Sequence, residues 1–278
     1  MFLEFFLFIF GLIIGSFLNV VIYRSIKNQS LFFSRSYCPK CKQVLKTVDL
    51  IPILSYIFLK GKCRYCFQKI SLYYPLVELT TGISFVLIYK LHFSLDNSIN
   101  IFNFQSFLTF FYLLIITCFF IIIFYSDLKY YLIPDKIIYS AILICFLYTS
   151  ISLFFFNNKN LLFFDNLKGL ILIPLFTGFI CSILFFSIYF FSKAKAIGFG
   201  DVKLVFLIGY FLSYPKILSG LFLAFLIGGT VGIFLILLGK KKLKSQVPFA
   251  PFLILGTFSA FFLEKETIFL LNFLNIAS

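Results

Sequence analysis

The sequence predicts an all-α polytopic membrane protein with about eight transmembrane helices and a small cytoplasmic four-cysteine, zinc-binding loop domain between the first two. Of its 278 residues, 62% are hydrophobic and 12% are charged, whereas soluble proteins are about 45–50% apolar and about 25% charged. The apolar residues gather in runs, most of them near the roughly 20 residues that cross a bilayer. One long polar stretch that contains cysteines interrupts these runs. This pattern excludes a soluble protein with a single core.

The apolar runs give the transmembrane helices in order. Glu4 stands near the start of the first run where a signal peptide would have a basic residue, and no small-residue cleavage site follows. We therefore expect a retained helix rather than a removable leader. The sixth and eighth runs are short. The expected spans are 2–23, 73–91, 104–126, 132–156, 167–191, 202–212, 217–238 and 249–262.

Basic residues predict the orientation of these spans. If the amino terminus lies outside, the inner segments carry 19 of the 24 Lys and Arg residues, as the positive-inside rule requires. Both termini are then on the outer side, and the net charge of +14 does not call for nucleic acid as a partner. The inner segments are 24–72, 127–136, 192–203 and 239–248.

The first inner segment contains two CxxC pairs, Cys38 with Cys41 and Cys63 with Cys66. The 21 residues between the pairs are near the spacing of a four-thiolate zinc site. Redox-active pairs and unligated thiols are the alternatives, but a reducing compartment disfavours structural disulfides. Four thiolates leave no open position on a zinc ion, so we expect the metal to shape the loop rather than to perform chemistry.

Two carboxylates, Asp127 and Asp201, are expected at the same inner membrane boundary although they are remote in sequence. A pair of neighbouring carboxylates shares a proton, so that one activates a water molecule and the other polarises a carbonyl group. Asp201 alone has a simpler interpretation as a helix N-cap. Asp127 is harder to dismiss, because it closes a helix, where the dipole disfavours negative charge.

Gly198 and Gly200 stand in front of Asp201 in the sequence GFGD. We expect that their missing side chains let a substrate backbone approach, and that they permit a turn with positive φ. Three other acids stay ambiguous. Asp49 is either solvated or bonded to backbone, Glu78 is either a boundary residue or a site residue, and Asp135 is explained as a first-turn acid.

Several motifs, in this order, resemble those of type IV prepilin peptidase, a GxGD-type aspartic protease. They cover most of the chain outside the variable spans. The motifs are GSFLNVVIYR (15–24), CPKC (38–41), LIPILSYIFLKGKCRYC (50–66), ISLYYPLVEL (70–79), SDLKYYLIPD (126–135), GFGDVKL (198–204) and VPFAPFL (247–253).

The resemblance implies an enzyme of the bacterial inner membrane that serves type IV pilus assembly or type II secretion. Such an enzyme removes the basic leader of prepilins or pseudopilins after a glycine at the cytoplasmic face. Bifunctional members then methylate the new amino terminus, usually Phe, with S-adenosylmethionine as methyl donor. By resemblance, the catalytic residues are Asp127 and Asp201, and Gly61 falls in the segment associated with methyl transfer.

The resemblance also implies a division of the chain into a first helix (1–23), a methyltransferase-associated four-cysteine domain (24–72) and a peptidase domain (73–278). Three alternatives stay open at this point: a peptidase whose cysteine-bearing loop only docks substrate, a proton- or cation-coupled transporter, and a structural component of a secretion apparatus. Intramembrane carboxylates also serve transporters, but those lie at mid-membrane depth, whereas Asp127 and Asp201 are expected at the inner edge.

Overall fold

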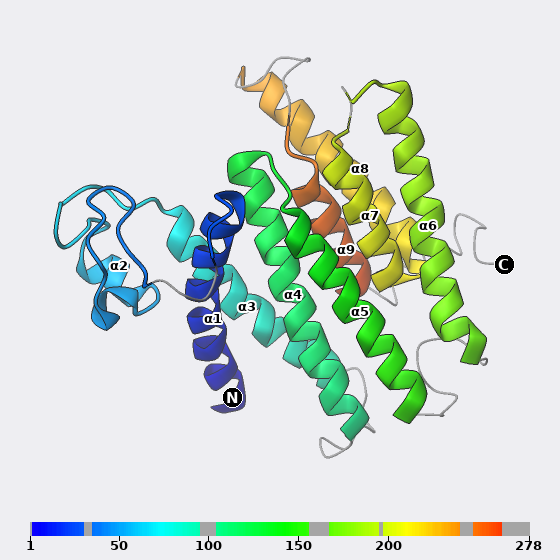
Figure 1. The fold of residues 1–278 in the computed structure, drawn as a ribbon, viewed down its shortest axis with the longest axis horizontal. Helices are drawn as coiled ribbons and strands as arrows, with labels where there is room; N and C mark the ends of the chain where they lie inside the picture. The colour runs from blue at the N-terminus through cyan, green and yellow to red at the C-terminus, as the bar shows by residue number, and fades with distance from the viewer. Residues whose placement is uncertain are drawn as a thin grey trace. The chain divides into compact units, whose positions relative to one another are not determined.

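The computed structural model describes residues 2–30, 35–94, 104–155, 167–194, 197–239 and 247–262. These residues form nine α-helices and one short 3-10 helix, η1, and they contain no strand beyond two isolated bridges (Figure 1). The chain divides into two compact units, residues 1–125 and 126–278. The predicted all-α fold is thereby confirmed.

The first unit is built on the close packing of α1 against α3. A Cβ atom on Gly11 would lie 2.7 Å from Cα of Gly82, and one on Gly15 would lie 2.7 Å from Cα of Glu78. Small residues of this kind let two membrane helices approach at backbone distance. The elements of this unit are α1 (Phe2–Ile26), η1 (Thr47–Leu50), α2 (Leu54–Phe58), α3 (Tyr73–Ser94) and α4 (Phe104–Tyr130) as far as Tyr125.

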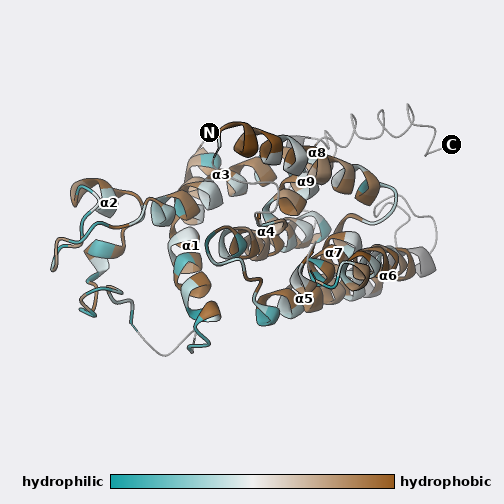
Figure 2. Cartoon of the chain, turned by 90° about the horizontal axis from the view of Figure 1, so that it is seen from above, coloured by the Kyte–Doolittle hydropathy of each residue, from teal (hydrophilic) through white to brown (hydrophobic). Residues whose placement is uncertain are grey.

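Polar contacts fix α3 to α4 within the first unit. Tyr73 donates a hydrogen bond to the carbonyl oxygen of Tyr125 at 2.8 Å, and the hydroxyl groups of Thr80 and Tyr125 are 3.1 Å apart. At the other end of α3, a ring nitrogen of His92 lies 3.1 Å from the Ser106 hydroxyl. In the sequence between α1 and α3 lies the cysteine-bearing segment with η1 and α2, where hydrophilic residues gather (Figure 2).

The second unit surrounds a short buried helix, α7 (Phe199–Leu212). Nine of its 14 residues are buried, and it contacts each of the other four helices that follow α4. On its two sides, the hydroxyl groups of Thr149 and Tyr210 lie 2.8 Å apart, and a Cβ on Gly209 would lie 2.9 Å from Cα of Gly178. The other helices are α5 (Asp135–Phe155), α6 (Leu167–Phe191), α8 (Lys216–Leu237) and α9 (Ala250–Phe262).

All eight predicted spans are helices in the structure. Among the described residues, six are long and apolar enough to cross a membrane, whereas α7 and α9, with 14 and 13 residues, are shorter, as expected of the sixth and eighth runs. The fourth predicted span is α5, which begins at Asp135 and not at 132, since Pro134 restricts the residue before it to extended conformations. The sixth predicted span is α7, which begins at Phe199, so that the GFGD motif lies in its first turn.

Candidate functional site

The carboxyl group of Asp127 is bound to the start of another helix. Asp127 lies in the last turn of α4, and its Oδ2 accepts a hydrogen bond of 3.1 Å from the backbone N–H of Ala250, the first residue of α9. The N-terminus of a helix has unsatisfied N–H groups and a positive dipole end, which stabilise a carboxylate. The N-terminus of α9 therefore offsets the unfavourable position of Asp127 at the C-terminus of α4.

Asp201 is positioned by the first turn of α7. Gly198 is the N-cap, and its backbone N–H donates a hydrogen bond of 3.1 Å to Oδ2 of Asp201. The alternative interpretation of Asp201 as the N-cap is therefore wrong: Asp201 is the third helical residue and bonds back to the cap. This bond fixes the direction of the carboxyl group.

The two carboxyl groups form a pair within the second unit. Only 6% of Asp127 and 8% of Asp201 is exposed, and the two lie close enough for the charge of Asp127 to act on Asp201. In the part of the chain that the structure describes, no Lys or Arg lies within 4.0 Å of either acid. Each uses Oδ2 for a backbone hydrogen bond, and no hydrogen bond to Oδ1 occurs among the described residues. The arrangement leaves one oxygen of each acid available to a water molecule.

Close packing accounts for Gly200 of the motif, and neither Gly198 nor Gly200 has a positive φ. Gly198 has φ −78°, and the positive-φ glycines among the described residues are Gly61 and Gly239, so the expectation of a positive-φ turn is wrong. A Cβ on Gly200 would lie 3.2 Å from Cβ of Ile133. Gly200 thus lets the segment before α5 approach the first turn of α7.

Asp135 forms an ion pair across the second unit. It is the first residue of α5, as its interpretation as a first-turn acid predicts, and Lys203 of α7 reaches its Oδ1 at 2.7 Å. The ammonium group of Lys203 also lies 4.9 Å from the centroid of the Phe199 ring. Since 61% of the Asp135 side chain is exposed, this pair differs from the buried Asp127 and Asp201.

The four predicted cysteine ligands come together in the first unit. The sulfur atoms of Cys38, Cys41, Cys63 and Cys66 all lie within 4.8 Å of one another, and those of Cys38 and Cys66 are 4.0 Å apart. A tetrahedral zinc site with Zn–S bonds of about 2.3 Å separates its sulfurs by about 3.8 Å. The donor set and the spacing therefore fit a zinc ion.

The two CxxC turns repeat the same backbone geometry. The N–H of the first cysteine donates to the carbonyl of a glutamine five residues later, at 2.9 Å in both Cys38–Gln43 and Cys63–Gln68. The residue four positions after that cysteine has a positive φ in both turns, 59° at Lys42 and 56° at Phe67. The sequence shows the same duplication, as CPKCKQ and CRYCFQ.

Asp49 holds the second turn against η1. It lies in η1, its side chain is 3% exposed, and it accepts hydrogen bonds from Arg64 at 2.7 Å, from Tyr65 at 3.2 Å and from the N–H of Lys46 at 3.1 Å. Burial opposes ionisation of Asp49, but the bonds from Arg64 and Lys46 prevail and lower its pKa. Asp49 is therefore bonded to both side chain and backbone rather than solvated.

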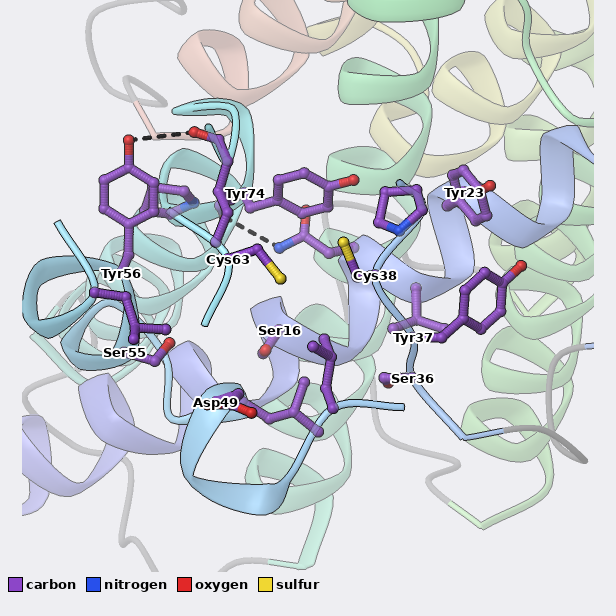
Figure 3. Close-up of a pocket in the computed structure, with 18 of the residues that line it drawn as sticks. Ser16, Tyr23, Ser36, Tyr37, Cys38, Asp49, Ser55, Tyr56, Cys63 and Tyr74 are labelled. Carbon is purple, nitrogen blue, oxygen red and sulfur yellow. Dashed lines mark hydrogen bonds between the residues drawn. The ribbon is translucent and has the colours of Figure 1, made fainter. Parts of the chain in front are cut away.

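Gly61 supports an aromatic ring. It has φ 67°, and a Cβ there would lie 2.9 Å from the hydroxyl oxygen of Tyr56. Tyr56 in turn lines a pocket next to Cys38 and Cys63 (Figure 3). The structure thus accounts for a glycine at this position, while its association with a methyl donor stays a prediction.

The structure adds residues that sequence reasoning missed. Ala250 contributes a backbone N–H, which no residue-type pattern identifies, although it lies in the quoted VPFAPFL motif. Asn19 is buried in α1 within the motif GSFLNVVIYR, and its amide oxygen has no hydrogen-bond partner among the described residues.

Comparison with known proteins identifies the family. Residues 9–92 match the bacterial peptidase A24 N-terminal domain, and residues 114–233 match the type IV leader peptidase family. A prepilin leader peptidase/N-methyltransferase of Bacillus subtilis is 31% identical over 92% of both chains. Enzymes of the same name are 28% identical in Aeromonas salmonicida, over 88% of this chain and 86% of the relative, and 31% identical in Vibrio cholerae, over 72% and 74%. No solved structure matches this chain.

These matches span both units, and they confirm the resemblance that the motifs indicated. The chain belongs to the type IV leader peptidase family.

Proposed function

We propose that this protein is a membrane aspartic endopeptidase that removes the basic leader of type IV prepilins or pseudopilins after a glycine and then methylates the new amino terminus. The observation that supports the peptidase most strongly is the meeting of Asp127 and Asp201, two buried acids from different helices with no cationic partner among the described residues. The names of the relatives support both activities.

In the proposed mechanism the two acids share one proton, because neighbouring carboxylates do not both ionise readily. The ionised carboxylate takes a proton from a water molecule, and the oxygen of that water attacks the scissile carbonyl carbon. The protonated carboxyl group donates a hydrogen bond to the carbonyl oxygen and stabilises the charge that develops there. Breakdown of the tetrahedral intermediate returns a proton to the leaving nitrogen and releases a free amine.

The hydrogen bonds from Ala250 and Gly198 orient this pair. Each binds Oδ2 of its acid and leaves Oδ1 for the water or the substrate. Because both donors are backbone groups at helix starts, the pair is held without a side chain that could compete for its proton. The basic-residue distribution supports a site at the cytoplasmic face of the bacterial inner membrane, with both termini outside.

We further propose that Cys38, Cys41, Cys63 and Cys66 hold a structural zinc ion. Zinc supplies folding energy to a loop that has little core of its own. The methyl group comes from S-adenosylmethionine, the methyl donor that the family resemblance implies. The boundaries proposed for the four-cysteine domain remain residues 24–72.

Leader removal by Asp→Asn variants tests the peptidase. Purified protein is incubated with a prepilin, and the products are identified by mass spectrometry. Asp127→Asn and Asp201→Asn are expected to insert normally and to lose leader removal. Asp135→Asn is the matched control, since it makes the same change at an exposed carboxylate. Full processing by either of the first two variants would exclude that residue from the site.

Metal analysis tests the zinc proposal. One zinc ion per chain is expected in the wild type, and Cys41→Ser and Cys63→Ser should lower this content. Cys145→Ser, which changes a buried cysteine of α5, should not. A wild-type protein that holds no zinc when purified without chelators would contradict the proposal.

A further inference from the structure

The first unit contains a pocket between two of its membrane helices and the cysteine-bearing segment. It has a volume of about 200 Å³ and lies among the inner ends of α1 and α3, the two CxxC turns and α2. Figure 3 shows the aromatic rings of Tyr56, Tyr74, Tyr23 and Tyr37 along it, with Cys38 and Cys63 between them. Its residues belong to neither the carboxylate pair nor the second unit.

One wall of the pocket has a hydrogen-bond acceptor without a donor. Asn19 is 6% exposed, and its Nδ2 donates a bond of 3.0 Å to the carbonyl of Tyr74. This bond fixes the orientation of the amide and leaves Oδ1 buried with no partner in the part of the chain that the structure describes. Buried acceptors are paired in most proteins, and an unpaired one requires an explanation. A ligand with an N–H group would supply the missing donor.

The same pocket contains a buried carboxyl group. Glu78 is 8% exposed and accepts a bond of 2.8 Å from the N–H of Ile53. Within the described residues, no Lys or Arg comes within 4.0 Å of it. A buried carboxylate without a countercharge is costly, and a cationic ligand would supply that countercharge.

The cations that line the pocket are directed elsewhere. Arg64 is paired with Asp49 at 2.7 Å. Arg24 donates to the carbonyl oxygens of Ser30 and Arg35. The aromatic rings in the pocket add a surface that suits a cation, because the face of an aromatic ring is negative. Acceptors, negative charge and aromatic faces together select an ammonium group.

The volume of the pocket and the names of the relatives narrow the choice of ligand. Sites for whole drug-sized ligands usually measure about 300–1,000 Å³, so this pocket suits a moiety about as large as one amino acid. The relatives are named as N-methyltransferases, and N-methylation acts on an amine. Leader removal would itself produce a free amino terminus.

We propose that this pocket binds the α-amino group of an amino-acid moiety through Glu78 and Asn19. The expected moiety is the new amino-terminal residue of the processed pilin, and the other source with the same chemistry is the amino-acid end of the methyl donor. The inference rests on the proposed methyltransferase function and concerns binding.

The test measures binding to the whole protein purified in detergent. Isothermal titration is performed with a short peptide that has an amino-terminal Phe, with its N-acetylated form, and with S-adenosylmethionine. Glu78→Gln is the main variant, because Gln can still accept the bond from Ile53 but has no charge. Glu4→Gln is the matched control, since Glu4 stands at the other end of α1 in a partly exposed pair with Lys90.

The wild type is expected to bind the free peptide at least tenfold more tightly than its acetylated form. Glu78→Gln should raise the Kd of the free peptide, or of S-adenosylmethionine if that is the ligand, at least tenfold. Glu4→Gln should leave the same Kd within twofold. A loss for the peptide alone identifies the pilin amino terminus, and a loss for S-adenosylmethionine alone identifies the methyl donor. Unchanged Kd values for both probes in Glu78→Gln would overturn the proposal.

Asn19→Leu provides a second variant in case Glu78→Gln unfolds, and it should raise the Kd of the same probe. Ser152→Ala is its control, because Ser152 has the other buried unpaired side-chain atom of the described residues but lies outside the pocket. The binding assay does not depend on the carboxylate pair. Failure of leader removal with intact peptide binding would therefore contradict the proposed peptidase and not this pocket.

Discussion

Replacing Asp49 by Asn should weaken zinc binding by the four-cysteine domain although Asp49 does not touch the cysteines. The Asp49 carboxylate accepts three hydrogen bonds, from Arg64, Tyr65 and the N–H of Lys46, and so ties η1 to the second CxxC turn. An Asn side chain has one acceptor oxygen and no charge. The variant therefore loses the charge-assisted character of the Arg64 bond and at least one of the other bonds.

The free energy lost in Asp49→Asn depends on how exposed the side chains of Asp49 and Arg64 are. Hydrogen bonds to charged groups contribute about 1.5–3 kcal/mol each, whereas exposed ion pairs contribute about 0–1 kcal/mol. The Asp49 side chain is 3% exposed but that of Arg64 is 47% exposed, so we expect a net loss of about 1–2 kcal/mol between these limits. That loss corresponds to a factor of roughly 5–30 in the folded population of the domain. Since metal binding is coupled to folding, the apparent zinc affinity should fall by the same factor.

The assay is competition between the protein and a chromophoric zinc chelator at fixed pH. Glu4→Gln is the control for the loss of one carboxylate from the same unit, and its zinc affinity should equal that of the wild type. Limited proteolysis without zinc should also show faster cleavage of residues 35–72 in Asp49→Asn. An Asp49→Asn protein with a wild-type zinc affinity would show that these bonds do not hold the turn in place.

Three further substitutions test the packing. Gly209→Val should lower the free energy of unfolding by about 1–3 kcal/mol, because its Cβ would lie 2.9 Å from Gly178, whereas Gly229→Val, with nothing within 4 Å, should leave the melting temperature unchanged. Gly61→Ala should destabilise more than Gly239→Ala in the same melting assay: both positions have positive φ, which costs a non-glycine residue roughly 1–2 kcal/mol, but only Gly61 also abuts Tyr56. Ser152→Ala should keep or raise the melting temperature, because it removes an unpaired buried hydroxyl, and a clear decrease would show that this hydroxyl has a partner.

The helices could be predicted because hydrocarbon imposes a simple requirement on each segment. All eight apolar runs are helices, and the two short ones are short in the structure. The predicted helix starts were wrong where single residues decide them. Because of Pro134, α5 begins later than predicted, and because Gly198 is the N-cap, α7 begins earlier, at Phe199. The cysteine cluster could be predicted because CxxC spacing by itself sets how two thiolates face one metal.

The reason that Asp127 tolerates its position could not be predicted. It depends on the backbone N–H of Ala250, which lies 123 residues away and belongs to another helix. Likewise, the assignment of Asp201 as cap or third residue depends on a shift of the helix start that apolar runs do not resolve. The pocket around Asn19 and Glu78 requires the packing of α1 against α3, which a single sequence does not contain.

A double-mutant cycle on the rate of leader removal tests whether Asp127 and Asp201 act together in one catalytic step. Rates are measured for the wild type, for each Asp→Asn variant and for the double variant, at equal amounts of inserted protein. The effects of substituting residues that act together are strongly non-additive, so either single variant is expected to be as slow as the double variant. Single variants that each retain part of the activity, with losses that multiply in the double variant, would contradict it.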